Sequence, residues 1–248
     1  MSDPGGPSRG WLYATQGDYH RNLDPDWSYT PTYVAKLAAV RRLITALPEG
    51  ARVLDAGCGE GVLVEEYRRR GLGIEGLDLN YESDFVRRGD VRSMPFADGS
   101  FDLVLLLDVL EHLEFRDQPR ALAEVHRTLR PGGLLALSTP NLAHMNARFK
   151  FLFCGQLDRA DTEVEHPGER TMEEYRCLLA SAGFFILRIR GITLTVPWVY
   201  RGLICRHAAR LRWLHDALEP AARLIPSLAL VTLFTCRKSE RVDASEGG

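Results

Sequence analysis

The sequence contains few lysines, no paired cysteines and no long uninterrupted hydrophobic run. Its 31 basic residues include only three lysines, and 33 acidic residues bring the formal net charge to −2. A chain without a basic surplus lacks the charge that neutralises a phosphate backbone, so the composition argues against a nucleic-acid partner. The longest apolar block, FDLVLLLDVL at 101–110, is broken by acids and is shorter than a membrane-spanning helix.

The cysteines are scattered and odd in number, and no two form a C-x-x-C pair. This pattern is typical of reduced thiols rather than of a zinc site or a disulfide framework. The first ten residues, MSDPGGPSRG, lack the apolar stretch of a signal peptide. We therefore expect a soluble, unprocessed, cytoplasmic protein without a bound metal. The five cysteines are Cys58, Cys154, Cys177, Cys205 and Cys236.

Short apolar stretches alternate with segments of helical spacing over most of the chain. Strands that are apolar on both faces and separated by helices indicate a parallel sheet covered by helices. The predicted fold class is α/β, with a doubly wound, mostly parallel seven-stranded sheet. Predicted strands cover 51–57, 72–79, 84–91, 101–109, 132–139, 184–192 and 228–236. Predicted helices begin at Thr30, Val62 and Thr171, and another runs through Leu122, Val125 and Leu129 to the Pro-Gly-Gly at 131–133.

The pattern predicts one folded unit over residues 11–238 between two disordered tails, 1–10 and 239–248. An N-terminal arm and helix occupy 11–49, and a ligand-binding core occupies 50–140. Residues 141–170 have no clean period and are interpreted as an inserted lid or substrate loop. A C-terminal part, 171–238, contains a helical cap at 196–226.

The stretch VLDAGCGEG at 53–61 carries the first chemical signal. Its three alternate glycines, Gly57, Gly59 and Gly61, follow an apolar strand and allow the backbone to approach a ligand closely. Alone, such a loop is often only a packing device. A phosphate loop would end in Gly-Lys-Ser or Gly-Lys-Thr, and a dinucleotide site disfavours an anion near the pyrophosphate. Asp55 supplies that anion, which suits a ligand that is cationic near the turn and carries no phosphate, such as S-adenosylmethionine.

With this loop the chain resembles the class I S-adenosylmethionine-dependent methyltransferases, in particular the group of the ubiquinone-biosynthesis O-methyltransferases and related small-molecule enzymes. The resemblance is strong over 50–141 and looser beyond. It implies S-adenosyl-L-methionine as the cofactor, Asp78 as the acceptor for the ribose hydroxyls, and Asp90-Val91 beside the adenine. The block LLDVLEHL at 106–113 would lie beside the transferable methyl group. The implied cofactor-binding residues are Asp55, Gly57, Cys58, Gly59, Gly61, Asp78, Leu79, Asp90, Val91, Asp108 and Val109.

One departure from the family pattern follows Asp78. Only six residues, 79–84, separate it from the next predicted strand, where the family usually has a full helix. We expect that helix to be absent or reduced to a turn, which leaves the ribose contact intact and makes the adenine contacts less certain.

Candidate general bases are histidines, because a neutral imidazole accepts a proton near pH 7. His112 follows the fourth predicted strand, and His166 lies at the end of the inserted segment, so these two are the predicted catalytic residues. His144, at the other end of that segment, is a further candidate. The alternative is that His112 only caps a helix or packs on the cofactor. His20 has a small chance of approaching the ligand, and packing or surface roles are expected for His126, His207 and His215.

Two segments outside the core carry open alternatives. The arm holds Trp11, Tyr13, Tyr19 and Trp27, whose rings could cover the sulfonium by cation–π attraction or simply dock the arm; Arg21 could meet a carboxylate or stay on the surface. The stretch 198–215 mixes apolar residues with arginines. It is interpreted either as an ordinary amphipathic cap or as a peripheral contact with an anionic membrane.

The predicted function is methylation of a small-molecule or lipid-like acceptor. The predicted reaction is O-methylation by in-line methyl transfer. An amino-methylating enzyme of nucleic acids would show an Asn-Pro-Pro-Tyr-like run after the fourth strand, where DVLEHL stands instead. A non-catalytic S-adenosylmethionine-binding scaffold and a nicotinamide-dependent oxidoreductase remain as alternatives. The acceptor itself and the oligomeric state do not follow from the sequence.

Overall fold

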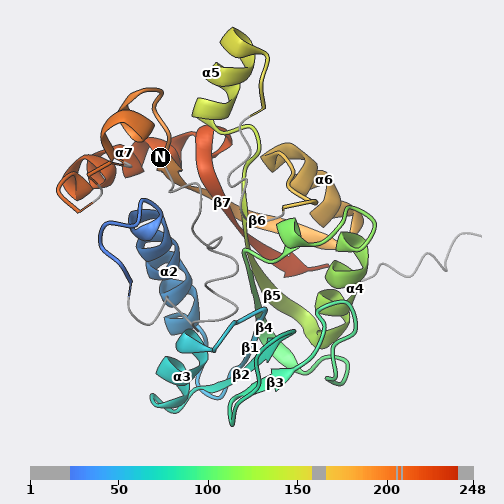
Figure 1. The fold of residues 1–248 in the computed structure, drawn as a ribbon. Coiled ribbons are helices and arrows are strands. Elements are labelled where there is room, and N and C mark those ends of the chain that lie inside the picture. The colour runs from blue at the N-terminus through green and yellow to red at the C-terminus, as the bar shows by residue number, and fades with distance from the viewer. Residues whose placement is uncertain (1–22, 158–165, 205, 208, 240–248) are drawn as a thin grey trace, which may run out of the picture.

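The computed structural model of the protein describes residues 23–157, 166–204, 206–207 and 209–239. Within them one sheet is flanked by helices on both faces (Figure 1). The strands are β1 (Arg52–Ala56), β2 (Gly73–Asp78), β3 (Val86–Arg88), β4 (Phe101–Leu107), β5 (Leu129–Pro140), β6 (Phe184–Leu194) and β7 (Ala229–Lys238). The helices and helical turns are α2 (Thr30–Thr45), α3 (Val62–Arg68), η1 (Leu110–His112), α4 (Gln118–Thr128), α5 (Met145–Cys154), α6 (Met172–Ser181), η2 (Tyr200–Ile204), α7 (Arg212–Leu224) and η3 (Pro226–Leu228).

The seven strands lie in the order β3-β2-β1-β4-β5-β7-β6. The first five strands pair in parallel, and β7 runs antiparallel to both of its neighbours. This confirms the predicted fold class. The strand order reverses between β1 and β4, where ligands of open α/β sheets bind at the carboxyl ends of the strands.

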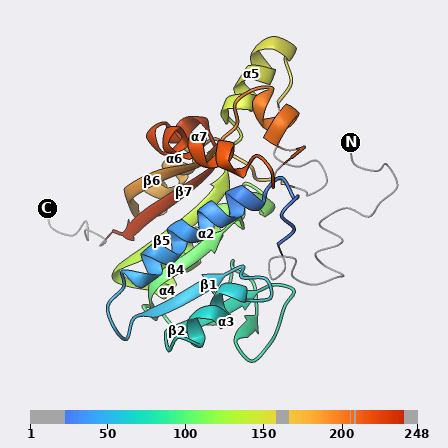
Figure 2. The same cartoon turned by 90° about the vertical axis from the view of Figure 1, so that its left-hand side faces the viewer.

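Both faces of the sheet are buried, as their apolar strands predict. Val53 of β1 packs on the face covered by α2 and α3, and its neighbour Leu54 packs on the face covered by α4 and α6. This alternation continues along β4, where Leu103 and Leu105 face one layer and Val104 and Leu106 the other. Figure 2 shows α2 lying along the sheet. The carboxyl ends of β1 and β4 are thus held between two packed layers.

Side-chain caps begin two of the helices, α5 and α6. The capping box at the start of α6 is present as predicted, with Thr171 and Glu174 bonding each other's backbone N–H. At α2 the N-cap is Tyr29 rather than Thr30, because the Thr30 hydroxyl donates to the carbonyl oxygen of Asp24 (2.6 Å). Between β2 and β3 the chain forms bends and a single bridge, so the expected loss of a helix after Asp78 is confirmed.

Three sequence-based boundaries differ from the structure. Leu129 does not extend the helix before it, because it pairs with Phe101 as the first residue of β5. The segment without a clean period, 141–170, contains the helix α5, whose exposed apolar residues hide any amphipathic pattern. The tail predicted to begin at 239 is ordered at its first residue, since Ser239 donates to the carbonyl oxygen of Gly183 from its backbone N–H and its hydroxyl.

Two predictions made from the composition concern the cysteines and the lack of a membrane-spanning helix. The four cysteines in the described part of the chain are free thiols. Among the same residues, none of the helices is both long and apolar enough to cross a bilayer.

Candidate functional site

The glycine loop after β1 forms the floor of the site. Gly57, Gly59 and Gly61 all have positive φ angles of 79°, 56° and 75°, which residues with a Cβ rarely adopt. A Cβ at Gly57 would lie 2.4 Å from Val109, and one at Gly61 would lie 2.6 Å from Val86. The loop therefore packs directly against Val109, which follows β4, and Val86, which begins β3, so Gly57 and Gly61 have a packing role whether or not a ligand is bound.

Asp55 lies under this loop with only 5% of its surface exposed. Burial, followed by the nearby carboxylate of Asp78, raises its pKa to about 7, although the Lys36 ammonium acts in the opposite direction. Two neighbouring carboxyl groups, one of them buried, favour a ligand that brings positive charge. The α-ammonium group of S-adenosylmethionine would supply that charge, so these residues fit this cofactor.

Asp78, at the end of β2, is held by the backbone. Its Oδ2 accepts from the N–H of Gly59 (2.8 Å), and its Oδ1 accepts from those of Asn80 (2.9 Å) and Tyr81 (3.3 Å). These bonds fill three of about four acceptor sites on a carboxylate. Contact with both ribose hydroxyls would therefore require one N–H bond to open, and the ribose assignment stays a prediction. Leu79 beside it is exposed.

After β3 the loop is shaped by Arg92, which the sequence-based interpretation did not single out. Its guanidinium donates to Asp90 (Nη2 to Oδ2, 2.6 Å; Nε to Oδ1, 3.0 Å) and to Asp117 (Nη1 to Oδ2, 2.7 Å). The hydrogen bonds from Arg92 lower the pKa of Asp90. Asp90 is thus an ion-paired carboxylate beside the buried Val91, and its contact with an adenine amino group stays a prediction.

Asp108, at the end of β4, is bound by a residue distant in sequence. Its carboxylate forms an ion pair with Lys36 of α2 and accepts from the hydroxyls of Tyr29 (3.0 Å) and Ser138 (2.5 Å). Burial alone would raise the pKa of Asp108, but the charge and hydrogen bond of Lys36 outweigh it and hold this pKa below its usual value. Asp108 also has a positive φ of 54°. Asp108 and Val109 directly follow β4, and these two residues form one wall of the candidate site.

Lys36 was missed by the sequence analysis, although a signal was present. It lies between Tyr33 and Val40 at helical spacing, on the stripe that α2 buries. A lysine at a buried position needs an anionic partner, and the acid after the fourth strand was available.

The two predicted catalytic histidines are brought together. His112 ends the turn η1, and His166 begins the second part of the described chain. Their ring centroids lie 4.7 Å apart at an interplanar angle of 78°. The buried amide of Gln118 holds these segments together, because its Nε2 donates to the carbonyl oxygens of Leu110 (2.9 Å) and Gly168 (2.7 Å).

Gly168 permits this contact. A Cβ at Gly168 would lie 1.9 Å from the carbonyl oxygen of Leu113, so a larger residue would push the segment of His166 away from η1. Neither Gln118 nor Gly168 was predicted. The Pro-Gly pair at 167–168 was the available signal, since such a pair marks a tight turn.

Glu111 adds a third group beside the histidines. It is 1% exposed, and its Oε2 is buried without a hydrogen-bond partner among the described residues. Burial and then the charge of Asp108 raise its pKa well above the usual value, which favours the neutral acid. One ligand atom each from Glu111, His112 and His166 lie within 4.8 Å of one another, so the group could hold a divalent cation once Glu111 loses its proton. The expected lack of a metal stays a prediction.

The remaining histidine candidates have structural roles or lie elsewhere. His144 is buried and caps α5, where its Nδ1 contacts the Thr195 hydroxyl (2.8 Å) and accepts from the N–H of Ala147 (3.4 Å). His126 packs on Phe184, and His215 bonds Thr193 (2.8 Å), as packing roles require. The ring of Trp27 contacts that of Tyr29. The remaining candidates of the arm, Trp11, Tyr13, Tyr19, His20 and Arg21, lie outside the described residues.

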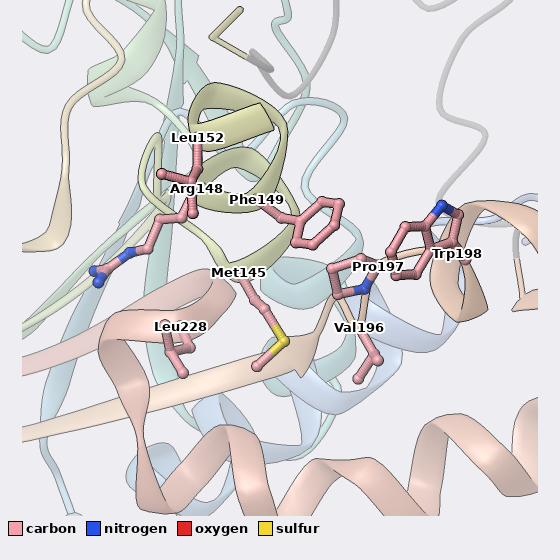
Figure 3. A pocket seen from close by; sticks show the side chains of 8 residues that line it. All are labelled: Met145, Arg148, Phe149, Leu152, Val196, Pro197, Trp198 and Leu228. Carbon is pink, nitrogen blue, oxygen red and sulfur yellow. The ribbon is translucent and has the colours of Figure 1, made fainter. Parts of the chain in front are cut away.

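An apolar groove of about 470 Å³ lies between α5 and the segment after β6. Figure 3 shows Phe149 of α5 turned toward Pro197 and Trp198. The rings of Phe149 and Trp198 lie 4.7 Å apart. The groove is lined almost wholly by carbon, so an apolar acceptor or acyl chain would suit it.

The chain matches a family model described as a methyltransferase domain over residues 27–188. A malonyl-[acyl-carrier protein] O-methyltransferase of Pectobacterium atrosepticum is 34% identical over 225 residues, which cover 81% of this chain and 80% of that protein. A probable S-adenosylmethionine-dependent methyltransferase of Mycolicibacterium smegmatis is 37% identical over 155 residues, 58% of this chain and 55% of that protein. A ubiquinone biosynthesis O-methyltransferase of Ralstonia nicotianae is 29% identical over 148 residues, 52% of this chain and 59% of that protein.

Solved structures agree on the fold. A S-adenosylmethionine-dependent methyltransferase of Archaeoglobus fulgidus superposes with a TM-score of 0.55 at 18% identity, covering 93% of this chain and 99% of that one. A 1,6-didemethyltoxoflavin-N1-methyltransferase of Burkholderia thailandensis, solved with 1,6-didemethyltoxoflavin and S-adenosylhomocysteine, gives a TM-score of 0.54 at 18% identity, covering 97% of this chain and 94% of that one.

Proposed function

Since the chain belongs to the S-adenosylmethionine-dependent methyltransferases, we propose that it methylates a hydroxyl oxygen of a small-molecule or lipid-like acceptor. The family membership makes S-adenosylmethionine the cofactor. It also argues against the two alternatives, a non-catalytic scaffold and an oxidoreductase. The observation that carries the proposal is the pairing of His112 with His166, 4.7 Å apart at the carboxyl end of β4.

The cofactor supplies a methyl group on a positively charged sulfur, which an acceptor oxygen displaces in line. The protein's own contribution is binding, alignment and proton transfer. Asp55 and the glycine loop would hold the cationic end of the cofactor, and Asp108 and Val109 would line the side next to the transferable methyl group. A neutral imidazole of the histidine pair takes the proton of the acceptor hydroxyl as the oxygen attacks.

The pairing of two imidazoles suits this role. In its neutral form each ring has one nitrogen that can accept a proton. The two rings lie 4.7 Å apart, so either could reach the same acceptor hydroxyl.

Oxygen is favoured by the relatives and by the site. Two of the three relatives compared by sequence are named O-methyltransferases, of malonyl-[acyl-carrier protein] and in ubiquinone biosynthesis. The N1-methyltransferase of Burkholderia thailandensis is only 18% identical and shows the fold alone. A carboxylate acceptor is already ionised near pH 7 and needs no base, whereas a hydroxyl acceptor does. The histidine pair therefore supports a hydroxyl.

The test is turnover of S-adenosylmethionine with phenols, long-chain alcohols and a malonyl thioester as acceptors. We expect His112→Ala and His166→Ala each to lower kcat for a hydroxyl acceptor by roughly 100-fold, the usual contribution of general base catalysis, with cofactor affinity unchanged. His207→Ala, at an exposed position, is the control. Full activity of both variants, or turnover of the malonyl thioester alone, would contradict the proposal.

A chelator separates a base from a metal ligand at the same histidines. Activity that survives the chelator supports the base. Loss of activity that Mg²⁺ or Zn²⁺ restores would instead assign Glu111, His112 and His166 to a cation that binds the acceptor oxygen. A cytoplasmic location and the lack of a nucleic-acid partner stay predictions.

A further inference from the structure

Among the described residues, the second half of helix α5 displays apolar side chains that no other element buries. Of its ten residues only Ala147 is buried, and Phe151, Leu152 and Phe153 are 55%, 75% and 66% exposed. Side chains of this kind are among the most often buried in proteins. Their concentration on one short helix indicates a contact surface.

A second segment extends this surface. Trp198, 75% exposed, contacts Phe149 of α5, and the chain continues into η2 and the start of α7, where Leu203 and Trp213 are also exposed. Figures 1 and 2 both place α5 and the 196–204 turn at the same end of the molecule. We name this surface, formed by 145–157 and 196–213, the outer face.

The outer face lies at the carboxyl ends of the strands, the same end of the sheet that carries the candidate site. The strand β5 ends at Pro140 and leads into α5. Because β7 runs antiparallel to both β5 and β6, β6 runs in the direction of β5, and its end at Leu194 leads into Trp198. Both halves of the outer face therefore follow the carboxyl ends of strands, as do Asp55, Asp78 and Asp108.

The charge of the outer face is one-sided. The stretches 145–157 and 196–213 contain six arginines and lysines and no aspartate or glutamate, in a chain whose net charge is −2. Arg206, Arg210 and Arg212 are exposed. Arg148 donates to the carbonyl oxygens of Ala143 and Ser227, which are uncharged acceptors.

We propose that the outer face docks the protein on the surface of an anionic lipid bilayer. Exposed tryptophan and phenylalanine rings interleaved with cations are the chemistry by which proteins lie in a lipid interface: the rings enter the acyl boundary and the cations meet the phosphates. The apolar groove between α5 and Trp198 then opens toward the bilayer. This goes beyond the proposed function, because docking would stand even if the acceptor were water-soluble.

Binding of the full-length protein to vesicles tests the proposal without any need for turnover. We expect the protein to sediment with vesicles of phosphatidylcholine containing about a third phosphatidylglycerol, and not with phosphatidylcholine alone, because each cation near an anionic surface strengthens binding roughly fivefold. Raising the salt concentration should release it. No sedimentation with the anionic vesicles would overturn the proposal.

Matched variants separate the outer face from the rest of the surface. Phe151→Ser with Phe153→Ser should lower vesicle binding at least tenfold, whereas Phe185→Ser should not, since Phe185 is equally exposed but lies at the start of β6. Arg210→Glu should weaken binding and Arg188→Glu, on β6, should not. Equal loss in both members of a pair would contradict the assignment.

Two further outcomes would assign the outer face to another partner. Light scattering could show a dimer that Phe151→Ser with Phe153→Ser dissociates, without vesicle binding. An acidic acyl carrier protein could bind through the same residues while vesicles do not. Either result would overturn the proposal and assign the outer face to that protein partner instead of a lipid surface. Cofactor binding by each variant, measured by calorimetry, checks that it is folded.

Discussion

Cofactor binding should depend on pH through Asp55. Its pKa of about 7 in the unliganded protein means that near neutral pH about half of the molecules carry a neutral carboxyl group at this position. The α-ammonium group of S-adenosylmethionine favours the ionised form. The neutral fraction must therefore release a proton before or during binding.

The size of the effect follows from linkage. If the bound cofactor lowers the pKa of Asp55 well below the working range, the dissociation constant is multiplied by one plus the ratio of neutral to ionised Asp55. Between about pH 7.5 and about pH 6.0 this factor rises roughly eightfold. The sign is that affinity falls as the pH falls, and binding at about pH 7 releases about half a proton.

Isothermal titration calorimetry measures both quantities. The dissociation constant is followed from about pH 6 to 7.5, and proton release is obtained from buffers of different ionisation enthalpy. Asp55→Asn should bind more weakly at the upper end of the range and lose the pH dependence. Asp102→Asn, a buried acid at the beginning of β4, and His112→Ala should retain it. A dissociation constant that does not change with pH, or an unchanged slope in Asp55→Asn, would refute the reasoning.

Two more substitutions test the walls of the site. Asp78→Ala should weaken cofactor binding by roughly 1.5 to 3 kcal/mol through loss of charge-assisted hydrogen bonds, measured by calorimetry, and an unchanged dissociation constant would remove the ribose assignment. Lys36→Met should destabilise the fold by roughly 3 kcal/mol in urea denaturation, because it leaves Asp108 without its buried cation. Combining Lys36→Met with Asp108→Asn should recover part of that loss, and a purely additive double variant would show that the pair is not coupled.

The positions of the residues expected to bind the cofactor could be predicted from the sequence because they lie at the ends of local elements. Gly57, Gly59 and Gly61 follow one strand, Asp78 ends the next, and the apolar patterns that place those strands are continuous. The strand order then brings these ends together, and the Asp78 carboxylate accepts from the N–H of Gly59 across 19 residues. Their contact with the cofactor stays a prediction.

The acceptor half could be predicted only in part, because contacts distant in sequence build it. Gln118 joins η1 to Gly168, 50 residues away, and Lys36 reaches Asp108 across 72 residues. His144 is a helix cap because Thr195, 51 residues on, lies beside it. Residue type and spacing identified the histidines, but only these contacts decide which of them face one another.

Four acids near the carboxyl ends of the strands, Asp55, Asp78, Asp108 and Glu111, interact electrostatically, and Lys36 acts on three of them. Burial keeps Glu111 neutral and Asp55 partly so, because a single lysine does not compensate four carboxylates. A cofactor that carries an ammonium group would restore the balance, so the charge of this cluster favours a cationic ligand.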